Sequence, residues 1–170
     1  MTGSAIDLLP GSAATVENCL FVNNLGNLGV DDVSQPGLKF NSEHGSGAIT
    51  VFYDSRITVS NSTFAGNWNG VDDKGRNNVY ARCIFWMNNA TGGISPGGRY
   101  EIDILDGRGV EDCWLNGETI DLRGTLSEDA NTFGAPDPEF DEDYVPQAAA
   151  YDGVGYRPVA NNDTFRSGTR

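Results

Sequence analysis

The sequence predicts an all-β solenoid of about five to six coils, built from short parallel strands. Three observations predict this fold class: a composition rich in glycine, segments that repeat at one fixed offset, and apolar pairs that recur about every 22 residues. Each coil is expected to carry two short strands, separated by turns of Gly, Asn and Asp.

The composition fits one globular domain. The chain has 170 residues, 38% of them hydrophobic, and a formal net charge of −13. Its 22 glycines and only two lysines, Lys39 and Lys74, favour turns over long helices. The acidic balance argues against nucleic acid and anionic membrane surfaces as partners, because both bind cationic surfaces. No apolar run approaches the roughly 18 residues that a transmembrane helix needs.

The repeat is clearest at an offset of 43 residues. The residues that recur at this offset are Ile6, Val16, Asn18, Phe21 and Asn24, matched by Ile49, Val59, Asn61, Phe64 and Asn67. We expect this offset to contain two coils, because small-then-aliphatic pairs occur within it. The aliphatic members of these pairs are Ile6, Val30, Ile49, Val71, Ile94 and Ile120. A second apolar column is expected through Cys19, Phe40, Ser62 and Cys83.

Strands this short cannot bury an apolar face alone. Stacking successive coils about 4.8 Å apart lets each strand pair in parallel with its copy in the next coil. The aliphatic column then faces inward, and Phe21, Phe64, Phe85 and Leu115 form another inward column. An antiparallel sandwich also fits short strands, but it gives no reason for a repeat at 43 residues.

One motif in the repeats resembles a known family. The motif Val-x-Asn-(Cys or Ser)-x-Phe-x-x-Asn occurs at 16–24 and 59–67, and more loosely at 80–88. Residues 3–122 thus resemble the repeat of pectate-lyase-like and polymorphic outer-membrane-protein-like surface proteins. The resemblance implies a right-handed single-stranded parallel β-helix, and an extracellular or cell-surface location. It says little about activity, because this scaffold carries many functions.

We expect two regions: coils over residues 1–125, and an irregular C-terminal cap and tail over 126–170. The segment Asp137-Pro138-Glu139-Phe140 resembles the one that follows the last coil in bacterial surface proteins, and it is suited to covering an open end. The N-terminal residues enter a coil directly, without a cap. We therefore expect either a preceding part of a longer β-helix, or stacking on another β-helix segment or subunit.

The three cysteines are Cys19, Cys83 and Cys113, and His44 is the only histidine. Their irregular spacing argues against a zinc site and favours buried free thiols.

Aspartates predominate beside the predicted aliphatic column. If each aliphatic residue points inward, the next one points outward; these outward residues are Asp7, Asp31, Thr50, Asp72, Ser95 and Asp121. Asp32 and Asp73 follow at the strand ends. The row has three interpretations: an acidic solvated face, a Ca²⁺ site formed by Asp7, Asp31, Asp32, Asp72 and Asp73, or a glycosidase-like carboxylate pair at Asp31 and Asp72.

Other polar and aromatic residues add weaker candidates. Trp68 and Trp86 lie near strand ends, where an exposed indole could stack on a sugar. Arg56, Arg76 and Arg99 are candidates for the base of a lyase. Asn18, Asn61 and Asn67 are expected to form amide ladders or turn hydrogen bonds.

Two hypotheses for the function follow. The first is a secreted or cell-surface structural, adhesin-like module without catalysis. The alternative is a protein that binds or cleaves an extracellular polysaccharide along its acidic face, with Asp7, Asp31, Asp72, Asp121 and Trp68 contacting the ligand and Ca²⁺ as a possible cofactor.

Overall fold

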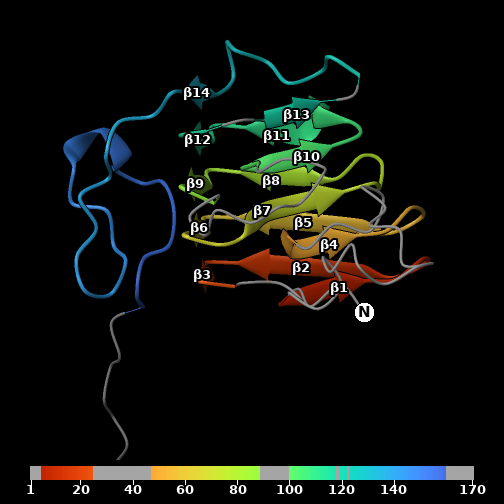
Figure 1. The fold of residues 1–170 in the computed structure, drawn as a ribbon, viewed down its shortest axis with the longest axis horizontal. Helices are drawn as coiled ribbons and strands as arrows, with labels where there is room; N and C mark the ends of the chain where they lie inside the picture. The colour runs from red at the N-terminus through yellow and green to blue at the C-terminus, as the bar shows by residue number, and fades with distance from the viewer. Residues whose placement is uncertain (1–4, 25–46, 89–99, 118, 122, 160–170) are drawn as a thin grey trace, which may run out of the picture.

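The protein is a stack of coils that forms three parallel β-sheets (Figure 1). The computed structural model describes residues 5–24, 47–88, 100–117, 119–121 and 123–159. Sheet A contains β1 (Ile6–Leu8), β4 (Gly47–Val51), β7 (Asn69–Asp73), β10 (Ile102–Ile104) and β13 (Thr119–Asp121). Sheet B contains β2 (Ala13–Glu17), β5 (Arg56–Ser60), β8 (Val79–Ala81) and β11 (Val110–Glu111). Sheet C contains β3 (Leu20–Val22), β6 (Thr63–Ala65), β9 (Ile84–Trp86), β12 (Trp114–Leu115) and β14 (Thr132–Phe133).

Each of the first four coils gives one strand to each sheet in chain order, and neighbouring strands pair in parallel. Within the described ranges this makes five coils, the last of which adds β13 to sheet A and β14 to sheet C. The predicted all-β parallel solenoid is confirmed, whereas the expectation of two strands in each coil is wrong, because the first four coils have three.

The 43-residue offset is one coil, and the prediction that it contains two coils is wrong. Ile6 pairs directly with Ile49, and Phe21 pairs directly with Phe64. The first coil therefore stacks on the coil that begins at β4. Val30 and Phe40, which we expected between them, lie outside the described residues, as does Ile94.

The later coils differ in length but keep their sheet register. Val71 pairs with Ile49 on one side and with Ile102 on the other. Ile102 thus holds the inward position that we predicted for Ile94. Ile120 pairs with Asp103, so its predicted alignment with Ile6 and Ile49 is also wrong. A longer connection shifts the coil boundary without changing the period-two pattern of either strand.

The inward columns form one core. Sheet A contributes Ile49, Val71 and Ile102, and sheet B contributes Val59, Tyr80 and Val110, all of them buried. In sheet C, the Phe21 and Phe64 rings stack with centroids 4.7 Å apart, and Phe64 and Phe85 stack at 4.8 Å. Leu115 continues this column against Phe85, as predicted. The spacing equals that of neighbouring strands, because the rings follow the backbone repeat.

Two corners use left-handed backbone. Between sheets B and C, the corner residues Asn18, Asn61, Arg82 and Asp112 have φ between 46° and 53°. Asparagine and aspartate tolerate this conformation better than most residues, which explains the Asn of the sequence motif. After sheet C, the corresponding corner is formed by Asn23, Gly66 and Met87.

A ladder of side-chain amides runs beside the second corner. We call Asn24, Asn67, Asn88 and Glu101 the asparagine ladder. Asn24 Nδ2 donates to Asn67 Oδ1 at 2.7 Å, and Asn67 Nδ2 donates to Asn88 Oδ1 at 2.6 Å. Asn88 Nδ2 donates to the carboxylate of Glu101. The predicted amide ladder at Asn67 is confirmed. Burial raises the pKa of Glu101 to about 7, against the lowering effect of the hydrogen bonds from Asn88.

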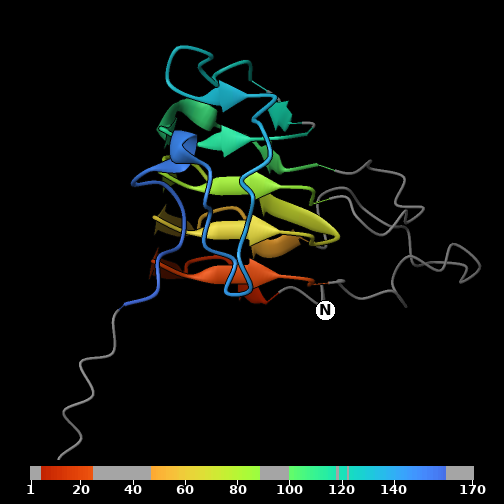
Figure 2. The ribbon, with the colours of Figure 1, turned by 90° about the vertical axis from the view of Figure 1, so that its left-hand side faces the viewer.

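The chain after β14 runs back along the outer face of sheet C (Figure 2). We call residues 134–159 the tail strap; it includes the single-turn helix η2 (Ala149–Tyr151). The Tyr151 ring packs on Trp114, with centroids 4.5 Å apart, and belongs to a cluster with Ile84. Leu126 packs against the main core beside the last coil. The C-terminal region thus contacts the core through Leu126 and covers the outer face of sheet C.

The thiols of Cys83 and Cys113 are buried and free, as predicted, whereas Cys19 is half-buried. Burial raises the pKa of Cys113 well above its usual value. Two single-turn helices, η1 (Gly107–Gly109) and η2, occur in the described part of the chain, and neither is long enough to cross a membrane.

Candidate binding site on sheet A

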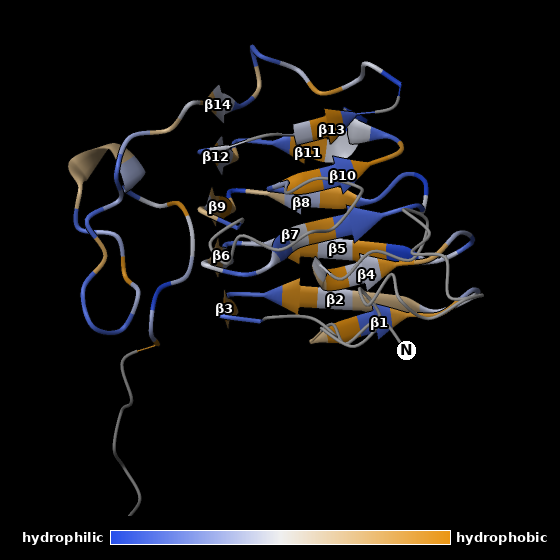
Figure 3. Ribbon diagram, viewed as in Figure 1, coloured by the Kyte–Doolittle hydropathy of each residue, from blue (hydrophilic) through white to orange (hydrophobic). Residues whose placement is uncertain are grey.

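A row of polar side chains follows the outer face of sheet A. Asp7 pairs with Thr50, Thr50 with Asp72, and Asp72 with Asp103. Figure 3 shows the hydrophilic residues in β1, β7 and β10 against the apolar strands around them. We call Asp7, Thr50, Asp72 and Asp103 the carboxylate row.

The row begins at Asp7, as predicted, and differs from the predicted row after Asp72. Asp121 pairs with Ile104, and its carboxylate accepts hydrogen bonds from the backbone N–H of Arg123 and Leu126 in the following turn. Asp103, which sequence reasoning missed, follows Asp72 instead. Asp31, Asp32 and Ser95 lie outside the described residues.

Lys74 neutralises the centre of the row. Its Nζ lies 2.9 Å from Asp72 Oδ1 and 2.9 Å from Asp103 Oδ2. Because both distances start at the same Nζ atom, Asp72 Oδ1 and Asp103 Oδ2 are separated by at most the sum of the two distances. Although burial alone would lower the pKa of Lys74, the charges of Asp72 and Asp103 raise it above its usual value. The expectation of a solvated acidic face holds for exposed Asp7 and is wrong for Asp72, whose side chain is 0% exposed.

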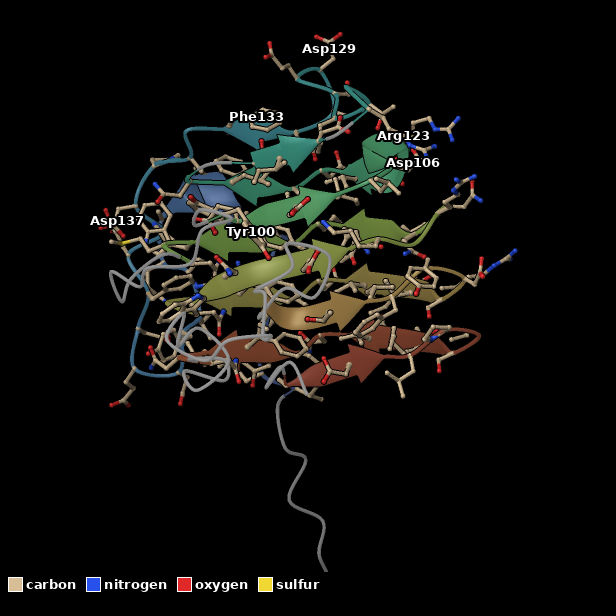
Figure 4. All side chains as sticks on the ribbon, turned by 45° about the vertical axis from the view of Figure 1, so that its right-hand side comes forward. Tyr100, Asp106, Arg123, Asp129, Phe133 and Asp137 are labelled. Carbon is tan, nitrogen blue, oxygen red and sulfur yellow. The ribbon has the colours of Figure 1, made fainter. Side chains whose placement is uncertain are left out.

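Tyr100 lies close enough to this ion pair to be affected by its charges, and Asn69 Oδ1 accepts a hydrogen bond from Tyr100 N. Tyr100 precedes β10 beside sheet A (Figure 4), and its pKa is raised by burial and by the charges of Asp72 and Asp103. Trp68 is buried, so it does not present the exposed ring that we considered for sugar stacking. Trp68 Nε1, Asn69 Nδ2 and Asp103 Oδ1 are buried without a hydrogen-bond partner.

Asp73 points to the other face of the sheet, into the stack. Its carboxylate accepts hydrogen bonds from Gly75 N at 2.7 Å, from Asn78 Nδ2 at 2.8 Å and from Tyr80 Oη at 2.8 Å. Burial raises its pKa, although these hydrogen bonds act in the opposite direction. The Asp73 carboxylate thus holds the turn after β7. We had considered it as a metal ligand at the strand end, and its oxygens are used for these hydrogen bonds instead.

A cleft opens where that turn meets the turn between β4 and β5. Its volume is about 390 Å³. We call it the basic cleft, because three cationic side chains, Arg56, Lys74 and Arg76, line it together with Tyr53, Asp54 and Asn77. Arg56 and Arg76 are exposed, whereas the Lys74 side chain is 13% exposed. Lys74 thus connects the open cleft to the buried carboxylates.

A divalent cation does not fit the centre of the row as it stands, because the lysine ammonium lies against both carboxylates. Among the described residues, no group of three His, Cys, Asp or Glu side chains could hold a metal ion. Asp31 and Asp32, two of the predicted ligands, lie outside that set. The calcium interpretation stays a prediction.

The three-sheet stack and its in-register columns agree with a comparison of the sequence with family models. A model described as a right-handed β-helix region matches residues 1–122. The chain belongs to the right-handed β-helix family. No curated protein and no solved structure matched the chain. Proteins of this family are commonly surface-located or carbohydrate-active, and this membership specifies no activity.

Sequence reasoning missed Lys74 and Asp103 as partners of Asp72. One signal was present, since Lys74 is one of only two lysines and lies two residues after Asp72. No local signal pointed to Asp103, because the connection before β10 lengthens that coil.

Proposed function

We propose that this β-helix is a non-catalytic, adhesin-like module that acts outside the cell or at its surface. In this role the stack of coils is a rigid support, and its outer surface contacts an extracellular polymer without cleaving it.

The observation that carries the proposal is the ion pair of Lys74 with both Asp72 and Asp103. A glycosidase needs one carboxyl group that is protonated and one that is ionised. Here the Lys74 ammonium instead lies 2.9 Å from both carboxylates and occupies the space that a glycosidic oxygen would need between them. The side chains of Asp72 and Asp103 are also 0% and 9% exposed, which leaves little access for a sugar. The arrangement is better suited to joining neighbouring coils.

Cleavage of a polysaccharide is the second candidate. One observation favours it: Asp72 and Asp103 lie opposite each other on adjacent strands. Two carboxylates close together are the arrangement that a glycosidase uses. The two candidates differ in what happens when Asp103 is neutralised.

The test uses the full chain and its Asp103→Asn variant. Both are incubated with neutral and acidic polysaccharides, and newly formed chain ends are measured. We expect the wild-type protein to form no more chain ends than the Asp103→Asn variant does. Chain ends that the wild-type protein forms and a folded Asp103→Asn variant does not would contradict the proposal and support the second candidate.

The structural role of Lys74 is tested by stability. Lys74→Met removes the cation that pairs with two buried carboxylates and is expected to lower the free energy of unfolding by about 3–5 kcal/mol. Arg76→Met, an exposed cation on the same turn, is the matched control and should change it by less than about 0.5 kcal/mol. Equal effects in urea unfolding would show that the ion pair does not hold the coils.

Calcium binding is tested on the same proteins. A cation that binds the native state raises the melting temperature as its concentration rises. We expect no increase at millimolar calcium, because Lys74 already neutralises the row. An increase that Asp72→Asn removes would restore the calcium interpretation.

A further inference from the structure

The basic cleft lies at the corner between sheets A and B, over three successive coils. The turn after β4 contributes Tyr53 and Asp54, the turn after β7 contributes Lys74, Arg76 and Asn77, and Leu105 follows β10. Its volume of about 390 Å³ is at the small end of ligand pockets, and is suited to one or two sugar residues.

Three basic side chains and one carboxylate, that of Asp54, line the cleft, and Lys74 is already paired with Asp72 and Asp103, so the exposed guanidinium groups of Arg56 and Arg76 are the cations left for a ligand. The protein has 11 basic residues and a net charge of −13, yet three basic residues line this one cleft. In the described ranges, no carboxylate lies within salt-bridge distance of the Arg56 or Arg76 guanidinium, the ion pairs there being those of Lys74 and Arg108. A guanidinium binds carboxylate or sulfate oxygens through paired hydrogen bonds. The cleft therefore favours an anionic ligand.

An exposed aromatic ring borders the same cations. Tyr53 is 60% exposed, which makes it one of the most exposed large apolar side chains in the described part of the chain. A tyrosine ring offers an apolar face and a polar hydroxyl, and both suit a sugar ring with hydroxyl groups at its edge. A simple inorganic anion would use the arginines but not this ring.

The turns that carry these side chains are fixed before any ligand arrives. Asp73 holds the turn of Lys74 and Arg76 through its hydrogen bonds with Gly75 N and Asn78 Nδ2. Asn78 Oδ1 in turn accepts a hydrogen bond from Ile57 N, next to Arg56, at 2.9 Å. A preformed site loses less conformational entropy on binding than a flexible one.

We propose that the basic cleft binds a saccharide unit that carries a carboxylate or sulfate group. Arg56 and Arg76 contact the anionic group, and Tyr53 packs on the sugar ring. The inference rests on the proposed function, since it names the chemical class of the polymer that the module contacts.

The test measures binding to the full chain by calorimetry at physiological salt. One pair of probes is a galacturonate trimer and its fully methyl-esterified form; the other is a sulfated disaccharide and its desulfated form. We expect one acidic probe of either pair to bind at least tenfold more tightly than its neutral form. Which pair shows the difference identifies carboxylate or sulfate as the group recognised.

Variants locate the binding. Arg56→Gln and Arg76→Gln should each weaken binding of that acidic probe about tenfold or more, since each removes a charged hydrogen bond. Tyr53→Ala should weaken it and Tyr53→Phe should retain most of it. Arg123→Gln, an exposed arginine outside the cleft, is the matched control and should bind as the wild type does.

Several results would overturn the inference. One is that the neutral probes bind as tightly as the acidic ones, and another is that neither acidic probe binds. A third is that Arg56→Gln and Arg76→Gln leave the binding unchanged. Self-association that Arg76→Gln abolishes would assign the cleft to an acidic surface of a second copy instead. If no acidic probe binds, the result of the chain-end assay still stands. If that assay detects cleavage, the proposed function is rejected, but the assignment of the ligand to this cleft is not.

Discussion

Glu101 is a carboxylate inside the stack, with 1% of its surface exposed. It closes the asparagine ladder by accepting hydrogen bonds from the backbone N–H and the side-chain amide of Asn88. Because burial removes water from the carboxylate, its pKa rises from 4.5 to about 7. The folded protein therefore binds a proton at a pH at which the unfolded chain has lost it.

The consequence is a pH dependence of stability. The contribution of Glu101 is fully present below the unfolded pKa near 4.5 and is lost as the pH rises through the folded pKa of about 7. This group alone should lower the free energy of unfolding by about 3 kcal/mol over that interval. Glu101→Gln should remove that part of the decrease, as measured by urea unfolding at pH 5 and pH 8.

Glu111→Gln, at an exposed position of β11, is the control for loss of a negative charge. It should retain the pH dependence of the wild type. Asp73 has a raised pKa as well, and it is present in all three proteins, so the comparison isolates Glu101. If Glu101→Gln and the wild type lose stability equally between pH 5 and pH 8, Glu101 does not titrate in this range.

At the scale of elements, the tail strap connects coils that are far apart in the sequence. Gly155 N donates to Arg82 O, and Tyr156 N donates to Thr63 Oγ1, both at 2.9 Å. Asn18 accepts from Arg157 N at 2.8 Å and donates to Arg157 O at 2.7 Å. The strap therefore contacts the third, second and first coils in turn, along the corner between sheets B and C.

Two glycines of the strap allow a matched test of this contact. Gly155 and Gly153 both have positive φ, of 77° and 73°. A Cβ at Gly155 would lie 2.4 Å from Ile84 Cδ1 and 2.8 Å from Thr63 Oγ1, whereas a Cβ at Gly153 would meet nothing within 4 Å. Both Ala variants carry the same backbone strain of about 1–2 kcal/mol, so the difference between them reports the close approach.

We expect Gly155→Ala to lower stability by about 1–3 kcal/mol more than Gly153→Ala, because the strap must move away from sheet C. Hydrogen exchange should then be faster at the Gly155 and Tyr156 amides, while amides of the central strands keep their protection. Equal exchange in the two variants would mean that the strap is not held against the corner.

At the scale of the whole molecule, the stack is a chain of nearest-neighbour contacts. Each coil rests on the coils before and after it, so an inner position has two neighbours. Phe64 lies between Phe21 and Phe85 in the column of stacked rings and is fully buried. Phe21, in the first coil, stacks on Phe64 alone in the described part of the column and is 7% exposed.

Phe64→Ala should therefore lower the free energy of unfolding by about 3–5 kcal/mol. Phe21→Ala should lower it by at least about 1 kcal/mol less, since it removes one ring contact instead of two. Urea unfolding followed by far-UV circular dichroism measures both. A larger loss for Phe21→Ala would argue against additive stacking of the coils.

The sequence by itself determined the kind of structure. Period-two strands identified the inward residues, and the matched positions at 43 residues identified Phe21 and Phe64 as equivalent. The Asn residues of the repeated motif indicated turns or an amide ladder, and the structure places them at a left-handed corner and in the ladder. These features are readable because each depends on a few adjacent residues: alternation decides which face is apolar, and a corner requires a residue that tolerates positive φ.

Only the tertiary structure decided which coil lies next to which. Asp103 reaches Asp72 and Lys74 because β10, after a longer connection, pairs with β7, and the basic cleft exists because turns from successive coils meet at one corner. A connection can lengthen without changing the alternation of the strands on either side, so the local pattern fixes the face of each residue and leaves its neighbour undetermined. The hydrogen bonds between strands decide which residues become neighbours, and therefore which charges are buried together.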